Sequence, residues 1–406
     1  MNSKRILFLC GHYAFPSAAN SICVQNLAEE AVKQGIESFV LARGYEYRGT
    51  CEVINGVKVW KCYGDTYGRV VDYFETKKGV FFKLLFKLIQ SIHYIVVFWS
   101  YPITSFFDLY SIKLRAKKLV KQYDIGTVVA TYGPYETIKV AMCLKSSYKN
   151  SIRAVSYHLD LLTNPSNSSS IVSKLKQYKA SLVLKKEFEL MDRVILPSTA
   201  PIINNSKIKY VDFPLYITKP LTSFTGSKTF FNPGCINIAI AGSLDTSNRN
   251  PLIFCNIIEG LTVNNKQVIL HIWGRIVGLD LSGFSNVIYH GMANVEDVPI
   301  ILQQSDFLFN VGNKNSFRML PSKIFQMFAA KKPIIFLCLN TQDRSIPYFD
   351  KYGYTCFIPG FEGGAKDYKE MVKNFIVAHY GKPIDVDDSV FKESTPSFIL
   401  NSIMEP

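Results

Sequence analysis

At residues 236–243 the chain reads Ile-Asn-Ile-Ala-Ile-Ala-Gly-Ser, an apolar run of strand length that leads into a loop containing glycine. Residues 251–261 follow with apolar side chains at helical spacing. A strand, a glycine-containing loop and a helix make up the first half of a βαβ unit, from which doubly wound parallel sheets are built. We therefore predict that an α/β domain begins here, past the middle of a chain of 406 residues.

The N-terminal end of the chain shows the same pattern. An apolar run at residues 6–9 precedes a loop that contains His12, a helical pattern covers residues 22–33, and a second strand pattern covers residues 38–42. Asn55-Gly56 separates two pairs of β-forming residues, which predicts a hairpin. A parallel sheet is therefore expected to start at the N-terminus as well.

Two α/β patterns in one chain predict two domains, since this length exceeds what a single hydrophobic core usually serves. Residues 216–233 contain proline and glycine among serine and threonine and show no clear periodicity, as is typical of a linker. We place one Rossmann-like domain at residues 1–217 and a second at residues 218–406, so the predicted fold class is α/β with two doubly wound domains.

Composition narrows the class of partner. Hydrophobic residues make up 48% and charged residues 19%, which excludes a disordered chain, and 46 Lys and Arg against 32 Asp and Glu give a net charge of +14. Such a charge favours phosphorylated ligands, acidic lipid or nucleic acid, but no nucleic-acid motif accompanies it, so we expect no nucleic-acid partner. The nine cysteines are scattered without a C-x-x-C pair, and the apolar run near Met1 is too short for an export signal. A cytoplasmic protein is expected.

Residues 79–119 have the most unusual composition. No Asp, Glu, Lys or Arg occurs from 88 to 107, a length that reaches that of a membrane span. An interior Pro102 and the spacing of Lys83 and Lys87 favour a helix that lies in the membrane interface. We predict a peripheral protein on an anionic membrane surface, the inner face of the cell membrane. The alternative is a pair of core helices of the first domain.

Three segments of the second half carry a family resemblance: residues 287–291 (Val-Ile-Tyr-His-Gly), 298–306 and 320–335 (Leu-Pro-Ser-Lys-Ile-Phe-Gln-Met-Phe-Ala-Ala-Lys-Lys-Pro-Ile-Ile). They resemble GT-B glycosyltransferases, most of all the group 1, family 4 type that builds bacterial capsule, O-antigen and exopolysaccharide. Residues 6–9, 55–57, 123–125, 158–160 and 191–195 are similar to successive landmarks of the same family.

The resemblance implies two Rossmann-like domains that face each other across a cleft, with the nucleotide-sugar on the C-terminal domain and the acceptor on the N-terminal one. A tail at residues 389–403 would cross back to the first domain. The family works without a bound metal, so no metal and no cofactor are expected besides the donor substrate. Retention of the anomeric configuration is favoured, and the transferred group would be a hexosyl or related sugar.

The resemblance also assigns roles to single residues. Gly242 and Ser243 would let the backbone approach the donor diphosphate, and Arg249 and Lys323 would supply cations to it. The physical reason is that negative charge grows on the diphosphate as it leaves, and fixed cations stabilise that charge. His158 would face the reacting sugar, with a structural, hydrogen-bonded histidine as the alternative.

Further donor-site residues follow from the same resemblance. Pro321 and Ser322 would begin a helix, with the Ser322 hydroxyl able to cap backbone N–H groups. Gly274 and Arg275 would line the base or ribose side of the donor, and Gln326 would hydrogen-bond the ribose diol.

The sequence departs from the family at informative positions. Many relatives carry two glutamates eight positions apart, where this chain has Arg318 and Gln326, and Ala18-Ala19 stand where relatives have glycines. Three functions therefore stay open. The chain is a glycosyltransferase that moves a sugar from a nucleotide-sugar to a lipid-linked or oligosaccharide acceptor, a binding partner subunit without catalysis, or a nucleotide-sugar epimerase. An epimerase would need acidic groups in the cleft and no membrane segment.

Overall fold

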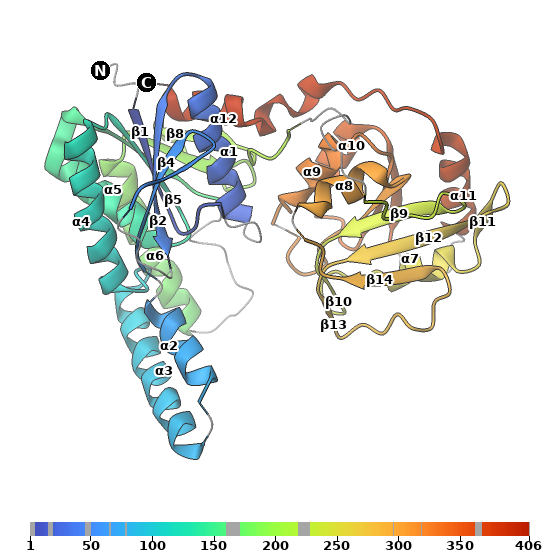
Figure 1. Cartoon of the computed structure of the whole chain (residues 1–406), viewed down its shortest axis with the longest axis horizontal. Coiled ribbons are helices and arrows are strands. Elements are labelled where there is room, and N and C mark those ends of the chain that lie inside the picture. The colour runs from blue at the N-terminus through green and yellow to red at the C-terminus, as the bar shows by residue number, and fades with distance from the viewer. Residues whose placement is uncertain are drawn as a thin grey trace. The chain divides into compact units, whose positions relative to one another are not determined.

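The computed structural model describes residues 5–14, 19–44, 50–64, 66–77, 79–159, 171–217, 228–294, 296–317, 319–361 and 368–405. The chain divides into two compact units, one formed by Met1–Pro214 with Pro396–Pro406 and the other by Leu215–Thr395 (Figure 1). The division falls three residues before the boundary placed from the sequence at 217. Helix α12 (Pro396–Met404) belongs to the first unit, as its packing against α1 (Ala19–Lys33) shows.

The first unit is built on a sheet with strand order β3-β4-β2-β1-β5-β6-β7-β8. The strands are β1 (Arg5–Cys10), β2 (Glu37–Gly44), β3 (Glu52–Ile54), β4 (Val57–Tyr63), β5 (Thr127–Thr131), β6 (Arg153–Tyr157), β7 (Arg193–Pro197) and β8 (Ile208–Val211). All pairs are parallel except β3 with β4. Strand order reverses direction between β1 and β5, which makes their carboxyl ends the switch point of a doubly wound sheet.

The β3–β4 hairpin turns at the predicted Asn55-Gly56 pair. Asn55 has φ 50° and Gly56 has φ 82°, so both central residues occupy the left-handed region that a two-residue hairpin loop of this type requires. The predicted hairpin is confirmed.

Helices α4 (Phe106–Tyr123), α5 (Tyr135–Tyr148) and α6 (Ile171–Leu190) accompany this sheet, whereas α2 (Thr66–Glu75) and α3 (Val80–Ser100) project from the unit (Figure 1). Two ring stacks join the projecting pair, Tyr67 on His93 and Phe74 on Phe86. No residue of α3 is buried, but α4 buries a full face that includes Ile112 and Leu119. The core-helix interpretation is therefore wrong for α3 and correct for α4.

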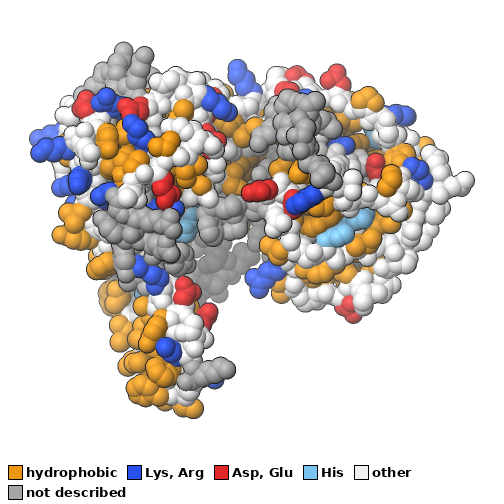
Figure 2. Space-filling view, viewed as in Figure 1, with side chains coloured by type: hydrophobic (Ala, Val, Ile, Leu, Met, Phe, Trp, Pro, Cys, Tyr) orange, Lys and Arg blue, Asp and Glu red, His pale blue; other side chains and the backbone are white. Residues whose placement is uncertain are grey.

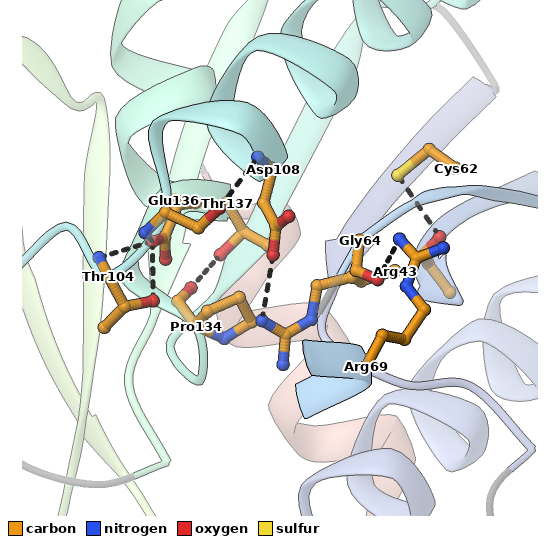
Figure 3. A network of polar contacts seen from close by, with 11 residues as sticks. Arg43, Cys62, Gly64, Arg69, Thr104, Asp108, Pro134, Glu136 and Thr137 are labelled. Atoms are coloured by element: carbon orange, nitrogen blue, oxygen red, sulfur yellow. Dashed lines mark hydrogen bonds and ion pairs between the residues drawn. The ribbon is translucent and has the colours of Figure 1, made fainter. Parts of the chain in front are cut away.

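A buried polar network fixes the base of α3 (Figure 3). Oε1 of Glu136, at the start of α5, accepts hydrogen bonds from the backbone N–H groups of Thr104 and Ser105, at 2.6 and 2.7 Å, and from the Thr104 hydroxyl. Beside it, Arg43 at the end of β2 pairs with the buried Asp108 of α4 at 3.3 Å. These contacts tie the loop between α3 and α4 to the sheet.

The second unit repeats the doubly wound design. Its parallel strands are β9 (Ile236–Ala241), β12 (Lys266–Trp273), β14 (Val287–Gly291), β15 (Phe307–Val311), β16 (Ile334–Cys338) and β17 (Thr355–Pro359). Their order is β14-β12-β9-β15-β16-β17, with the short β11 (Thr262–Val263) antiparallel to β12. The switch point lies between β9 and β15. The predicted fold class, α/β with two Rossmann-like domains, is confirmed.

The helices of the second unit are α7 (Leu252–Ile258), α8 (Asp297–Gln304), α9 (Lys323–Ala329), α10 (Ile346–Tyr352) and α11 (Tyr368–His379). The strand at 236–241 and the helix after it match the expected start of the second domain, although α7 is shorter than the 251–261 pattern. Phe254 of α7 stacks on Phe309 of β15 with ring centroids 4.1 Å apart, so this helix is fixed over the switch point.

Candidate functional site

A pocket of about 130 Å³ lies at the switch point of the second unit. It is lined by Ala239, Ile240, Ala241, Arg249, Val298, Leu302, Phe309, Asn310, Pro321, Ser322, Lys323, Gln326 and Met327. Ligands of doubly wound folds bind at this place, where the carboxyl ends of strands running to either side leave a crevice. Five residues assigned from the sequence come together here, namely Arg249, Pro321, Ser322, Lys323 and Gln326.

Arg249 is held rigidly at this pocket. Its Nε donates to the Val311 carbonyl at 3.0 Å and its Nη2 donates to Asn310 Oδ1 at 3.3 Å. Burial lowers the pKa of its guanidinium, and the carboxylates of Asp343 and Asp245 oppose that shift. A guanidinium stays protonated under such shifts, so the pocket keeps a fixed positive charge.

The loop that carries Arg249 is itself organised by hydrogen bonds. Oδ1 of Asp245 accepts from the Ser247 hydroxyl and from the backbone N–H groups of Ser247 and Asn248, and these hydrogen bonds, the hydroxyl's most of all, lower the pKa of the Asp245 carboxyl. Asn248 Oδ1 in turn accepts from the backbone N–H groups of Asn315 and Ser316. The loops after β9 and β15 are thus joined, and Arg249 is positioned between them.

Lys323 brings a second cation to the pocket. Its Nζ lies 3.5 Å from the Ala241 carbonyl oxygen, and its pKa is lowered by desolvation and by the positive charge of Arg249. Among the described residues that line the pocket there is no Asp or Glu. Two neighbouring cations in a pocket whose lining provides no carboxylate favour an anionic ligand, because an anion relieves their repulsion.

The start of α9 differs from the expectation. The helix begins at Lys323, after Pro321 and Ser322, but the Ser322 hydroxyl makes no capping hydrogen bond. Ser322 has helical backbone angles, φ −57° and ψ −28°, whereas a capping residue has an extended backbone that brings its oxygen over the next N–H groups. Ser322 is one of the residues that line the pocket.

The remaining residues that the resemblance assigns to the donor lie directly after β9 and β12. The backbone N–H of Gly242 donates to Trp273, and that of Gly274 donates to Gly291. A Cβ built on Gly242 would lie 3.5 Å from Arg249 Nη1, so Gly242 borders the guanidinium. Ser243, Gly274 and Arg275 are not among the residues that line the pocket. Arg318 lies outside the described residues.

His158 does not line either pocket described here. Its side chain is buried, and its Nε2 lies 2.6 Å from Oε1 of Glu187, a fully buried residue of α6. Its ring also stacks on Tyr132. The ring is sequestered in a hydrogen-bonded pair, which favours the structural alternative for His158. Asp160 lies outside the described residues.

The first unit has a pocket of its own at its switch point, with a volume of about 290 Å³. It is lined by Cys10, Gly11, His12, Asn20, Ser21, Thr131 and Gly133. A Cβ built on Gly11 would lie 2.4 Å from the Gly133 carbonyl oxygen, so glycine is required where the loops after β1 and β5 meet. Of this set, sequence reasoning proposed only His12 as a site candidate. The Gly133-Pro134 pair, two residues after the end of β5, was the available signal for the other loop.

Asn310 is a polar residue of the second pocket's lining that sequence reasoning missed. It lies near the end of an otherwise apolar strand, Phe-Leu-Phe-Asn-Val, and is only 3% exposed. That interruption of an otherwise apolar strand was the signal.

No protein-family profile and no curated protein matches this sequence. Solved structures do match, and three of them illustrate the likeness over nearly the full length of both chains. They are a glycosyltransferase of kitacinnamycin (TM-score 0.53, 10% identity, 98% of both chains), a glycosyltransferase from Rickettsia africae ESF-5 (0.53, 11%, 100% of this chain and 97% of that one) and a UDP-GlcNAc 2-epimerase from Methanocaldococcus jannaschii (0.52, 9%, 98% and 99%). The chain has the GT-B fold. At these identities the likeness concerns the fold alone.

Proposed function

We propose that the protein is a glycosyltransferase that binds its nucleotide-sugar donor in the pocket of the second unit. The observation that carries this proposal is the pair of cations, Arg249 and Lys323, at the switch point of a GT-B domain. When the bond between the sugar and the phosphate breaks, negative charge grows on the diphosphate, and preorganised cations stabilise it without further reorganisation. Arg249 meets this requirement because two hydrogen bonds fix its guanidinium.

The rest of the pocket fits a nucleotide. Gln326, one turn into α9, offers an amide that can donate to and accept from a ribose diol, and the Ser322 hydroxyl adds a further polar group. Val298, Leu302 and Met327 form an apolar wall, as ligand pockets usually have. The phosphates of a nucleotide would bind at the two cations, and its less polar parts would pack against the apolar wall.

The acceptor would bind to the first unit. Its pocket is lined by Asn20, Ser21, Thr131 and His12, a polar set without Asp, Glu, Lys or Arg that suits the hydroxyl groups of a saccharide. We propose a lipid-linked or oligosaccharide acceptor and a role in bacterial surface polysaccharide synthesis, with retention of the anomeric configuration, as the resemblance of residues 287–335 implies.

Helix α3 supports a membrane-bound acceptor. By length and composition it could cross a membrane, and none of its hydrophobic window is buried. Phe81, Leu88, Ile92, Ile95 and Trp99 recur at helical spacing and are each more than half exposed, so they form one apolar face. Figure 2 shows hydrophobic side chains gathered on this projection of the first unit.

We infer that the apolar face of α3 rests in the interface of an anionic bilayer. Lys83 and Lys87 are exposed on a different side of the helix, as in helices that lie along a membrane surface. The protein would thus be cytoplasmic and peripheral on the inner face of the membrane. An epimerase is the second candidate, because a UDP-GlcNAc 2-epimerase is among the structures with the same fold. An epimerase needs no apolar membrane-binding face.

One experiment separates the candidates. The purified protein is incubated with a panel of nucleotide-sugars, with and without vesicles that carry lipid-linked saccharides. A transferase releases nucleoside diphosphate and elongates the acceptor only when both substrates are present, and the anomeric configuration of the product tests retention. A new nucleotide-sugar formed without acceptor would identify an epimerase. Binding without any turnover across the panel would favour the partner subunit.

A further inference from the structure

Asn310 places a buried amide at the floor of the second unit's pocket. Its Oδ1 accepts from Arg249 Nη2 at 3.3 Å. A guanidinium can only donate, so the atom of Asn310 that faces Arg249 must be the oxygen, and the opposite atom must be the Nδ2 amide nitrogen. The orientation of the amide is therefore fixed by chemistry.

The Nδ2 group has no hydrogen-bond partner among the described residues, although Asn310 is only 3% exposed. Buried donors in native proteins are nearly always paired, and an unpaired one lowers stability. Asn310 lines the pocket, so a ligand atom can reach this donor. The structure thus has a polar group in place that an acceptor atom of a ligand would satisfy.

We propose that Nδ2 of Asn310 donates a hydrogen bond to a phosphate oxygen of the bound nucleoside diphosphate; this rests on the donor site proposed above. The Oδ1 end of the amide is hydrogen-bonded to Arg249. A phosphate group that binds the guanidinium would therefore also lie next to Nδ2. Arg249 and Lys323 draw an anion to this end of the pocket, and phosphate oxygens are strong acceptors. Asn310 would then donate a hydrogen bond to the diphosphate through Nδ2 and orient Arg249 through Oδ1.

This arrangement makes asparagine different from aspartate at the same place. Asn310→Asp keeps the shape and an oxygen for Arg249, but it replaces the donor by a second acceptor and adds a negative charge. A phosphate oxygen would meet repulsion where it had a hydrogen bond. Ligands without phosphate would not meet this repulsion.

The test measures the affinity of the full-length protein for three probes by calorimetry: a nucleoside diphosphate, the matching nucleoside and inorganic pyrophosphate. For Asn310→Asp we expect the affinity for both phosphate-bearing probes to fall by at least about tenfold and that for the nucleoside to stay unchanged. The control is Asn256→Asp, which adds the same charge on an exposed position of α7 and should leave all three affinities as they are.

The outcomes separate this proposal from the one on which it rests. If the wild-type protein binds neither the nucleoside diphosphate nor pyrophosphate, the donor site itself is wrong. If the wild type binds them and Asn310→Asp binds equally well, the role of Asn310 is overturned. An equal loss for the nucleoside would show that the amide contacts the base or ribose and would overturn it too. Should the aspartate variant not fold, Asn310→Ser is measured with the same probes and judged by the same results.

Discussion

Oε1 of Glu136 accepts a hydrogen bond from the backbone N–H of Thr104 at 2.6 Å, and this contact joins the start of α5 to the loop that leaves α3. Glu136 is fully buried, and the same oxygen also accepts from Ser105 N–H. One carboxylate therefore holds two backbone N–H groups of the loop that connects α3 to α4.

Glu136→Ala should destabilise the first unit, because the backbone N–H groups of Thr104 and Ser105 lose their buried acceptor. Hydrogen bonds to a charged group contribute about 1.5–3 kcal/mol each, so we expect a loss of about 3 kcal/mol or more in the free energy of unfolding measured with urea. Glu136→Gln should lose less, since its amide oxygen can still accept. Equal stability of the alanine variant and the wild type would contradict this role.

Gly274 should be irreplaceable for a steric reason. A Cβ at this position would lie 2.1 Å from the Gly242 carbonyl oxygen, and Gly274 also has φ 139°. Gly274→Ala is expected to lower the free energy of unfolding by more than about 2 kcal/mol. The matched control is Gly260→Ala, which has φ 64° but nothing within 4 Å of the added Cβ, and it should cost about 1 kcal/mol. If the two variants unfold at the same urea concentration, the close contact does not matter.

The second unit should become less stable as the pH is lowered, because His271 must take up a proton. Burial and, as the smaller cause, the neighbouring His290, 3.0 Å away, together lower the pKa of His271 to about 4. Because the folded-state pKa is depressed, the unfolded chain binds the proton first. The contribution of neutral His271 to the free energy of unfolding is fully present above the unfolded-state pKa of about 6.5. It is lost as the pH falls towards 4, by about 3 kcal/mol at most.

Urea unfolding between pH 4 and pH 7.5 checks this window. His271→Phe keeps a ring beside Trp273 and Phe231 and removes the titration, so its stability should vary less with pH than that of the wild type. An unchanged pH dependence in the variant would show that other groups control it.

Removal of either pocket cation should weaken donor binding. Arg249→Ala and Lys323→Ala each lose a charge-assisted contact with the diphosphate, and we expect a loss of about 1.5–3 kcal/mol in the binding free energy of a nucleoside diphosphate. Lys351→Ala, on α10 of the same unit and outside the pocket lining, removes an equal charge and should have no effect. If both pocket variants bind with the affinity of the wild type, the cations do not meet the ligand.

Local patterns predicted the features that local forces determine. The Asn55-Gly56 turn and the strand at 236–241 depend on backbone conformation and on apolar periodicity, both of which can be read from a few neighbouring residues. The clustering of Arg249 with Lys323 required the family resemblance, since 74 residues separate the two positions in the sequence.

Features that depend on distant partners could not be predicted. Nothing near His158 in the sequence indicates its buried pair with Glu187, because that partner comes from another helix. The apolar composition of α3 likewise did not show that this helix packs on no core, whereas the more polar α4 after it packs on the sheet. The role of Asn310 depends on where β15 ends relative to β9, which is a property of the assembled sheet.

Membrane binding through α3 should be lost when its apolar face is made polar. Ile92 and Ile95 are 53% and 60% exposed on that face, and each would contribute about 1.5–3 kcal/mol by leaving water. Ile92→Asp with Ile95→Asp should therefore abolish co-flotation with vesicles of anionic lipid. Ile202→Asp is the control, because Ile202 is 92% exposed elsewhere on the first unit and should not matter.

The same assay distinguishes a helix on the surface from one that spans the bilayer. Lysines near an anionic surface contribute on the order of 1 kcal/mol each, and salt screens that attraction. High salt should release part of the protein, and replacement of Lys113, Arg115, Lys117 and Lys118 of α4 by Gln should release more. Resistance to high salt and to alkaline carbonate, with extraction only by detergent, would show that α3 spans the membrane and would overturn the peripheral assignment.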